Sequence, residues 1–287
     1  MEILDNKIQK TALYKSHKML NAKMVPFCGF EMPISYPDGI QSEYYSVRNG
    51  VGIFDVSHMG EFIINGPNAL QLLQKVTIND VSKLDVGQAQ YSAMCYEDGG
   101  IVDDLIIYRK SDGYFMVVNA ANIQKDFDWI NQYVPNGTQL KNISSDISLV
   151  AVQGPRSRKL LSQFTDIDLV MPFYSFKEAV VCGFSVMVSR TGYTGELGFE
   201  IYASEEAVIT IWDELIKVGA QPAGLAARDI LRLEMSYCLY GNDIDETINP
   251  LEAGLGWITS LDKEKFIGFD RIQQEKKVGS KRRLVAF

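Results

Sequence analysis

The stretch AQYSAMCYEDGGIVDDLIIY, residues 89–108, decides the fold that this sequence predicts. Residues 89–96 and 101–108 are rich in the apolar and β-branched side chains that strands prefer. Between them, Glu97-Asp98-Gly99-Gly100 is typical of a tight turn, because glycine adopts the backbone conformations that hairpin turns need. We therefore expect an antiparallel hairpin here.

The segments on either side extend this hairpin to an α+β unit. Further strands are predicted at 61–65, 114–118 and 147–152, with helices after Pro67 and over 122–133. This order, β-α-β-β-β-α-β, is typical of an antiparallel sheet that helices cover on one face.

Beyond residue 150 the pattern partly repeats. We expect a helix after Pro155, strands at 179–189 and 198–202, and a helix over 225–235. Another helix is expected to bury Val208, Ile211, Trp212 and Leu215. A loop-rich return follows at 249–256, and the closing LVAF, 284–287, has the character of a strand cut short. The chain thus predicts two similar α+β units.

The composition is typical of a soluble globular protein. Of 287 residues, 46% are hydrophobic and 22% charged, and no apolar run approaches the roughly 20 residues that span a bilayer. The N-terminus lacks the apolar core of a secretory signal, and the first arginine, Arg48, comes too late for a transit peptide. The expected location is the cytoplasm, with no membrane contact.

Several kinds of site are disfavoured. A net charge of −8 argues against nucleic acid as a partner, because an acidic body repels phosphates. The four cysteines form no CxxC pair and are expected to be buried reduced thiols. With only two histidines, and neither a GxGxxG nor a Walker-type motif, the sequence predicts no metal site and lacks the usual markers of nucleotide sites.

Two adjacent acids, Asp103 and Asp104, stand inside the apolar strand IVDDLIIY. Alternation places one carboxylate on each face, with Val102 and Ile106 beside Asp104 and Leu105 beside Asp103. A carboxylate in such surroundings is costly to desolvate unless a positive or hydrogen-bonding group meets it. One interpretation is an edge strand with both acids solvated or capping a bulge, and the other is a functional carboxylate.

Two further segments bear polar groups. In SRTGYTGELGFE, residues 189–200, glycines that permit positive φ angles or close backbone approach stand beside Tyr193 and Glu200, although a structural turn between strands is the simplest interpretation. In 226–232, helical spacing puts Arg228 and Arg232 on one face and lets Asp229 meet Arg232. A surface ion-pair ladder is the simplest interpretation of that segment.

Together these segments resemble the glycine cleavage system T protein family, the folate-dependent aminomethyltransferases. The resemblance covers almost the whole chain, with eight segments in the family's order. They are TALYKSHKMLNAKMVPFCGFEMP (11–33), FDVSHMGE (54–61), GGIVDDLIIY (99–108), MVVNAAN (116–122), AVQGP (151–155), SRTGYTGELGFE (189–200), GLAARDILRLE (224–234) and NPLEAGLGW (249–257).

The resemblance implies a multidomain α+β cloverleaf, in which antiparallel sheets flanked by helices surround a central folate pocket. The first α+β domain would comprise 1–50 and 138–240, and the second 51–137 and 241–275. Family members continue into a small C-terminal β-barrel, which we expect to be truncated here to its start, 276–287.

The resemblance also implies an activity. The family transfers the one-carbon unit of an aminomethyl group from the dihydrolipoyl arm of lipoylated H protein to tetrahydrofolate, with release of ammonia. Tetrahydrofolate would be a co-substrate, and no metal is implied. Arg156, Arg158 and Lys159 are expected to help dock H protein, unless they merely solvate the helix after Pro155.

Other functions within the superfamily stay open. They are another folate-linked demethylation and folate binding without turnover. An iron–sulfur assembly factor would carry a KGCYxGQE-like stretch, which the residues around Cys238 match only superficially.

The resemblance assigns the key carboxylate to Asp104 rather than Asp103. An ordinary aspartate pKa of about 3.9 would keep it ionised near neutral pH, where it would orient the folate amine and stabilise developing positive charge. Glu200 would bind the pterin amino group and ring N–H. The other predicted folate contacts are Met59, Tyr91, Val117, Asn119, Tyr174, Tyr193, Arg228 and Tyr237.

Overall fold

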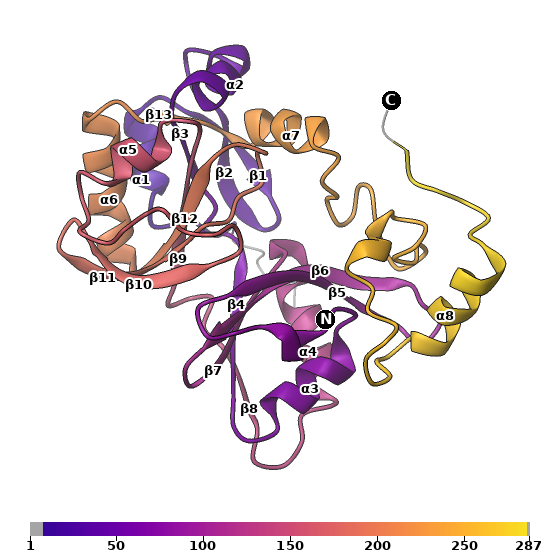
Figure 1. Ribbon diagram of the computed structural model, residues 1–287. Helices are drawn as coiled ribbons and strands as arrows, with labels where there is room; N and C mark the ends of the chain where they lie inside the picture. The colour runs from indigo at the N-terminus through magenta and orange to yellow at the C-terminus, as the bar shows by residue number, and fades with distance from the viewer. Residues whose placement is uncertain (1–7, 286–287) are drawn as a thin grey trace, which may run out of the picture. The chain divides into compact units, whose positions relative to one another are not determined.

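The computed structural model describes residues 8–285, which form two compact units (Figure 1). The first unit comprises the described residues up to 58 together with 145–173 and 177–235, and the second comprises 59–144, 174–176 and 236 onward. Each unit has its own sheet and hydrophobic core, as the repeated pattern predicted. The domain limits that the resemblance implies stay a prediction, since packing units and family domains divide a chain differently.

The second unit is built on a five-stranded antiparallel sheet with the strand order β5-β6-β7-β4-β8. The predicted hairpin forms β5 (Ala89–Cys95) and β6 (Ile101–Lys110), and β7 (Gly113–Val118) and β4 (Gly60–Asn65) are two further expected strands. β8 (Gln139–Asn142) was not predicted, because its mostly exposed residues show no apolar alternation.

Two helices cover one face of this sheet, α3 (Ala69–Val76) and α4 (Ile123–Asn131) (Figure 1). Leu72 and Leu73 of α3 pack with Phe62 of β4 and Leu105 of β6 in a single buried cluster. Both helices were predicted from their apolar periodicity. The strands' alternate residues point to the opposite face, which is the face that carries Asp104.

A β-bulge at the start of β6 changes one expected neighbour of Asp104. Asp103 lies opposite Met94, but Cys95 pairs with Ile101, so Val102 is the extra residue. Val102 consequently packs with the helix-covered cluster instead of beside Asp104. In addition, β6 is an interior strand of the sheet, so the interpretation as a solvated edge strand was wrong.

The first unit contains a six-stranded mixed sheet with the order β10-β11-β12-β9-β3-β13. Its strands are β10 (Phe176–Val181), β11 (Phe184–Ser189), β12 (Gly198–Ala203), β9 (Ser148–Gln153), β3 (Gly52–Asp55) and β13 (Gln221–Pro222). β9 is the strand expected at 147–152, and it pairs here rather than with the hairpin. The segment 179–189 is two strands, because the chain turns at Cys182 and Gly183 with positive φ angles.

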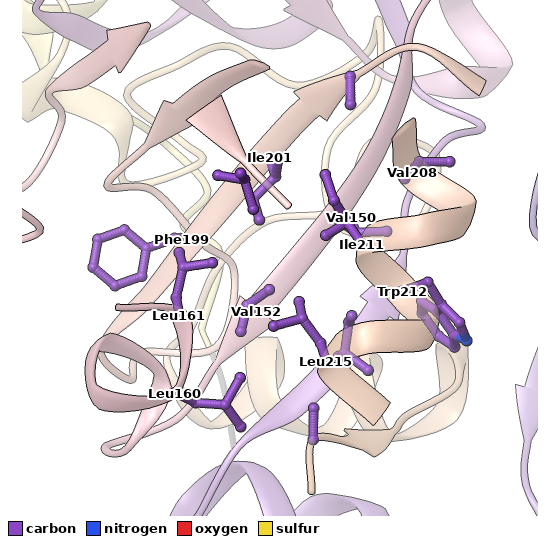
Figure 2. Packing of buried hydrophobic residues seen from close by; sticks show 14 of the residues in the cluster. Val150, Val152, Leu160, Leu161, Phe199, Ile201, Val208, Ile211, Trp212 and Leu215 are labelled. Atoms are coloured by element: carbon purple, nitrogen blue, oxygen red, sulfur yellow. The ribbon is translucent and has the colours of Figure 1, made fainter. Parts of the chain in front are cut away.

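Helix α6 (Glu205–Lys217) supplies much of the first unit's core. The Ser204 side chain caps it by accepting a hydrogen bond from the Ala207 backbone N–H at 3.3 Å, as the preference of serine for N-caps leads one to expect. Its predicted apolar face packs against Val150 and Val152 of β9 (Figure 2). The buried residues of this face are Val208, Ile211, Trp212 and Leu215.

The remaining helices and strands complete the two units. The first unit adds the hairpin β1 (Lys23–Phe27) and β2 (Phe30–Ser35) and the helices α1 (Tyr14–Met19), α2 (Ile40–Asn49), α5 (Ser157–Leu161) and α7 (Leu225–Glu234). The second adds α8 (Phe269–Val278) and 3-10 helices at Val81–Lys83, Ala120–Asn122 and Leu255–Trp257. Within the described residues, no helix is both long and apolar enough to cross a bilayer.

Some expectations at the ends of the chain and for the cysteines need correction. Leu284 and Val285 form no strand, and the rest of the expected closing strand lies outside the described residues, as do residues 1–7. All four cysteines are thiols, but Cys28 is exposed and Cys182 only partly buried, so the expectation that all are buried was wrong. Cys28 lies in the turn between β1 and β2, where the chain reverses with a positive φ.

Gly100 provides a test of the hairpin turn. A Cβ atom at this position would lie 1.9 Å from the backbone oxygen of Glu246, so one of the two backbones would have to move. We predict that Gly100→Ala lowers the free energy of unfolding by about 2–3 kcal/mol, measured by chemical denaturation. Gly256→Ala is the control, because its Cβ would meet only the Leu251 side chain, at 3.5 Å. Equal stability of the two variants would contradict the described turn.

Candidate functional site

The Asp104 carboxyl group receives hydrogen bonds from two of the other predicted site residues. The Tyr91 hydroxyl donates to Oδ2 at 2.8 Å, and the Asn119 side-chain amide donates to Oδ1 at 2.8 Å. Both contacts follow from the strand order, since β5 lies on one side of β6 and Asn119 directly follows β7 on the other. The structure therefore brings Tyr91, Asp104 and Asn119 together.

Val117 lies on the same face of the sheet as Asp104. In the strand register, Tyr91, Ile106 and Val117 stand opposite one another on β5, β6 and β7, and Asp104 is two residues from Ile106 on its strand. Because residues two apart on a strand share a face, Tyr91, Asp104 and Val117 point the same way. We call this the Asp104 face.

Trp257 stacks on Tyr91, a contact that the sequence analysis missed. The ring centroids are 6.0 Å apart with an interplanar angle of 28°, and the Trp257 side chain is 71% exposed. The residue belongs to the segment NPLEAGLGW, which was recognised only as part of the family resemblance. The exposed Trp257 ring therefore lies beside Tyr91, whose hydroxyl donates to Asp104.

Asp103 occupies the opposite face and is fully buried. The backbone N–H of Asn119 donates to its carboxylate at 3.1 Å, and the side-chain amides of Asn119 and Asn122 donate at 2.9 and 2.6 Å. The Asn119 amide thus contacts the carboxyl groups of both acids. Asp103 positions Asn119, which in turn contacts Asp104.

Burial and the negative charge of Asp103 raise the pKa of Asp104 to about 7. The hydrogen bonds from Tyr91 and Asn119 oppose this shift but do not cancel it. The assumption of an ordinary aspartate pKa was therefore wrong, and near neutral pH the group exists in both protonation states. Asp126 of α4, which is buried beside Asp103, also has a raised pKa, because of burial and the charge of Asp103. Asp103, Asp104 and Asp126 are therefore not all ionised at the same time.

A second set of predicted residues comes together in the first unit. The Arg228 guanidinium lies over the Tyr193 ring, 4.6 Å from its centroid, and its charge also acts on the buried Glu200 of β12. Burial raises the pKa of Glu200, whereas a hydrogen bond from Thr191 and the charge of Arg228 lower it. Tyr193, Glu200 and Arg228 thus form a cluster of an aromatic ring, an acid and a cation.

The glycines of the 189–200 segment shape this cluster through the Gln153 side chain. A Cβ atom at Gly192 or Gly198 would approach that side chain to 2.2 or 2.3 Å, and Thr194 donates a hydrogen bond to its Oε1 at 2.8 Å. Of the two predicted reasons for these glycines, close approach applies at Gly192 and Gly198. The segment is a structural turn, and it also holds Tyr193 and Glu200 in place.

The ion pair predicted on α7 is present but is not a surface ladder. Arg232 donates to Asp229 at 2.7 Å, and the Arg232 side chain is only 3% exposed. The expected geometry was confirmed, while the expected solvation of Arg232 was wrong.

His58 is a buried polar residue to which the sequence analysis gave no role. Its ring packs edge-on against Phe27, with the centroids 5.4 Å apart, and no group of the described residues bonds to its Nδ1. Burial, together with the charge of Arg228, lowers the pKa of His58 to about 4. His58 is therefore neutral at physiological pH.

Three other predicted folate residues lie outside the Tyr91, Asp104 and Asn119 set and the Tyr193, Glu200 and Arg228 cluster. Met59, Tyr174 and Tyr237 are all partly buried in the second unit, and their role in binding stays a prediction. Cys238 is buried among hydrophobic residues. Among residues 8–285, no group of three or more histidines, cysteines and acids is arranged to hold a metal ion.

Comparison with known proteins decides the family. The sequence profile of the GCVT N-terminal domain matches residues 13–263. The chain is 52% identical to an aminomethyltransferase of Flavobacterium psychrophilum, covering 98% of this chain and 79% of that protein, and 47% identical to one of Halothermothrix orenii, covering 98% and 80%. The chain belongs to the GCVT family of aminomethyltransferases. The resemblance found in the sequence is confirmed, and the chain is a transferase.

A solved structure supports the same family assignment and the α+β fold. The crystal structure of the glycine cleavage system aminomethyltransferase T from Bartonella henselae superposes with a TM-score of 0.89 at 32% identity. The match covers 95% of this chain and 76% of that protein. The predicted α+β class is confirmed by this family member.

The raised pKa of Asp104 gives a test by stability. Between about pH 4 and pH 7 the folded protein keeps a proton on Asp104 that the unfolded chain has released, so this group lowers stability as the pH rises. We predict that Asp104→Asn is more stable than wild type by about 4 kcal/mol above pH 7, and that the difference disappears toward pH 4. Urea unfolding at several pH values measures it, with the exposed Asp128→Asn as control. A gain that does not vary with pH would contradict a raised pKa.

Proposed function

We propose that this protein is the aminomethyltransferase of a glycine cleavage system, which transfers the one-carbon unit of aminomethyl-dihydrolipoyl H protein to tetrahydrofolate and releases ammonia. The observation that carries the proposal is the Asp104 carboxyl group, which is hydrogen-bonded by Tyr91 and Asn119 at the position that the family resemblance assigns to the key acid. The family membership supports it further.

Asp104 is proposed to act by charge and position. Positive charge develops on the transferred carbon as its bond to sulfur breaks and ammonia leaves, and a nearby carboxylate stabilises that charge. Tyr91 and Asn119 fix the two carboxylate oxygens, so little reorganisation is needed during the reaction. Because the pKa of Asp104 is close to 7, a bound amine would favour the ionised form and so prepare the group for this role.

Glu200, Tyr193 and Arg228 are proposed to bind the pterin. A carboxylate accepts two parallel hydrogen bonds from the amino group and ring N–H of a pterin, which makes Glu200 the specificity-determining acid of this set. The Thr191 hydrogen bond orients that carboxylate, and the Arg228 charge favours its ionised form. The central folate pocket and the contacts of Met59, Val117, Tyr174 and Tyr237 are part of the same proposal.

Lipoylated H protein is the proposed partner. Of the three basic residues expected to dock it, Arg156 and Lys159 are exposed, whereas the Arg158 guanidinium donates to the Leu169 backbone oxygen at 3.1 Å. The alternative, in which these residues only solvate α5, stays open.

Folate binding without turnover is the second candidate function. A pure binder would need Glu200 and its neighbours, but it would have no use for a carboxyl group that is costly to bury and held by two directed hydrogen bonds. Release of ammonia from aminomethylated H protein, measured with and without tetrahydrofolate, separates the two functions. Folate binding without ammonia release would favour the binder.

Asp104→Asn should reduce single-turnover transfer at least tenfold, because the amide cannot stabilise positive charge, while tetrahydrofolate binding survives. The wild-type rate should rise with pH through about 7, as Asp104 loses its proton, and this rise should be missing in the variant. Asp128→Asn should behave as wild type. A variant that keeps more than about a tenth of the rate would contradict the role of Asp104, since a role worth 1.4 kcal/mol corresponds to about tenfold.

Glu200→Ala should weaken tetrahydrofolate binding by at least about tenfold, since the pterin would lose two charge-assisted hydrogen bonds. Titration calorimetry measures the affinity. Glu205→Ala, which removes an exposed glutamate of the same unit, is the control. An affinity unchanged from wild type would remove Glu200 from the binding site.

A further inference from the structure

Glu61 is a fully buried acid whose carboxyl group has no hydrogen-bond partner among the described residues. It lies on β4 within the segment FDVSHMGE. Its backbone is bonded, because its N–H donates to Ser144 Oγ at 2.9 Å and its carbonyl oxygen accepts from the Ile143 N–H at 2.9 Å. Only the side chain lacks partners.

Among the described residues, the buried Asp126 beside Asp103 also has a carboxyl group without a hydrogen-bond partner, but two other buried acids are satisfied. Asp55 accepts hydrogen bonds from Thr11, His17 and Ser57, and Glu43 accepts from the backbone N–H groups of Tyr36 and Gly224. An unpartnered buried carboxyl group costs free energy, and an apolar side chain at the same place would avoid that cost. Glu61 is therefore poorly explained by stability alone.

The strand register places Glu61 on the Asp104 face. Glu61 of β4 stands opposite Val117 of β7, which stands opposite Ile106 of β6. Ile106 is two residues from Asp104 on the same strand, so the two acids share a face with Val117 between them. Two strand spacings across and two residues along put their Cα atoms about 12 Å apart. A flat bicyclic ring with its substituents spans such a distance.

Burial also selects the chemical form of Glu61. It raises the pKa of the carboxyl group well above its usual value, with no positive group opposing the shift. The neutral acid offers one O–H donor and one carbonyl acceptor. This pair matches the edge of a tetrahydropterin that Glu200 does not use, where the ring carbonyl accepts a hydrogen bond and the neighbouring N–H of the reduced ring donates one.

We propose that Glu61 is a further binding residue of the Asp104 face, and that its neutral carboxyl group hydrogen-bonds a polar edge of the bound pterin. This inference rests on the proposed function and extends it, because the resemblance assigns no role to Glu61. The bound ligand would supply the hydrogen-bond partners that the Glu61 carboxyl group lacks among the described residues. The cost of burying Glu61 would then be offset when the co-substrate binds.

Two variants of similar shape test the proposal. Glu61→Gln keeps one donor and one acceptor, whereas Glu61→Met removes both polar atoms and keeps the unbranched chain. Titration of tetrahydrofolate should give at least tenfold weaker binding to Glu61→Met and an affinity within about threefold of wild type for Glu61→Gln. Ile63→Val, a change on the same strand without polar atoms, is the control and should bind as wild type.

A second titration identifies the part of the ligand involved. A tetrahydropterin without the aminobenzoyl-glutamate tail should show the same relative loss in Glu61→Met. Chemical denaturation should show Glu61→Met to be at least as stable as wild type, which separates lost binding from lost folding.

The proposal is overturned if Glu61→Met binds tetrahydrofolate as wild type does, if Glu61→Gln binds as weakly as Glu61→Met, or if the loss is absent with the tetrahydropterin. These results differ from failure of the proposed function, which would appear as wild-type protein that binds no tetrahydrofolate.

Discussion

The register between β5, β6 and β7 is the constraint on which the candidate site depends. Two adjacent aspartates on one strand point to opposite faces, and the bulge at Val102 keeps that separation while leaving both faces packed. One acid is fully hydrogen-bonded on the helix-covered face, and the other lies on the Asp104 face with Tyr91. A slip of one residue would exchange their roles, because every side chain of the strand would change face.

The Asn119 amide makes the two acids interdependent. It contacts both carboxyl groups, so the position of Asp104 and its raised pKa both depend on Asp103, which the family resemblance leaves without a function. Buried negative charge is costly here, and the protein accepts that cost on the face where the proposed chemistry occurs. On that view, stability and function compete at Asp104.

Local pattern predicted many of the helices and strands but not their tertiary environment. The hairpin and α6 were predicted because alternation and helical periodicity match their burial, and the glycines of 189–200 because close approach demands glycine. The assignment of β9 to the other sheet, the exposed β8 and the contact of Trp257 with Tyr91 depend on pairing between distant segments, which periodicity does not record. The pKa of Asp104 was missed for the same reason, since burial and the neighbouring charge come only with the folded sheet.

The interleaving of the two units has a consequence for how the chain assembles. The five-stranded sheet uses strands between residues 60 and 142 only, whereas β3 at 52–55 must wait for β9 at 148–153, which pairs in turn with β12 at 198–203. Because closing long loops costs entropy before contacts repay it, nearby strands pair sooner than distant ones. During synthesis the inserted sheet would therefore acquire protected amides first, an order that pulse-labelled hydrogen exchange on ribosome-bound chains would record. Until then, the segments before and after this sheet would expose the apolar side chains that later form the core of the first unit. Exposed apolar surface of this kind is what chaperones bind.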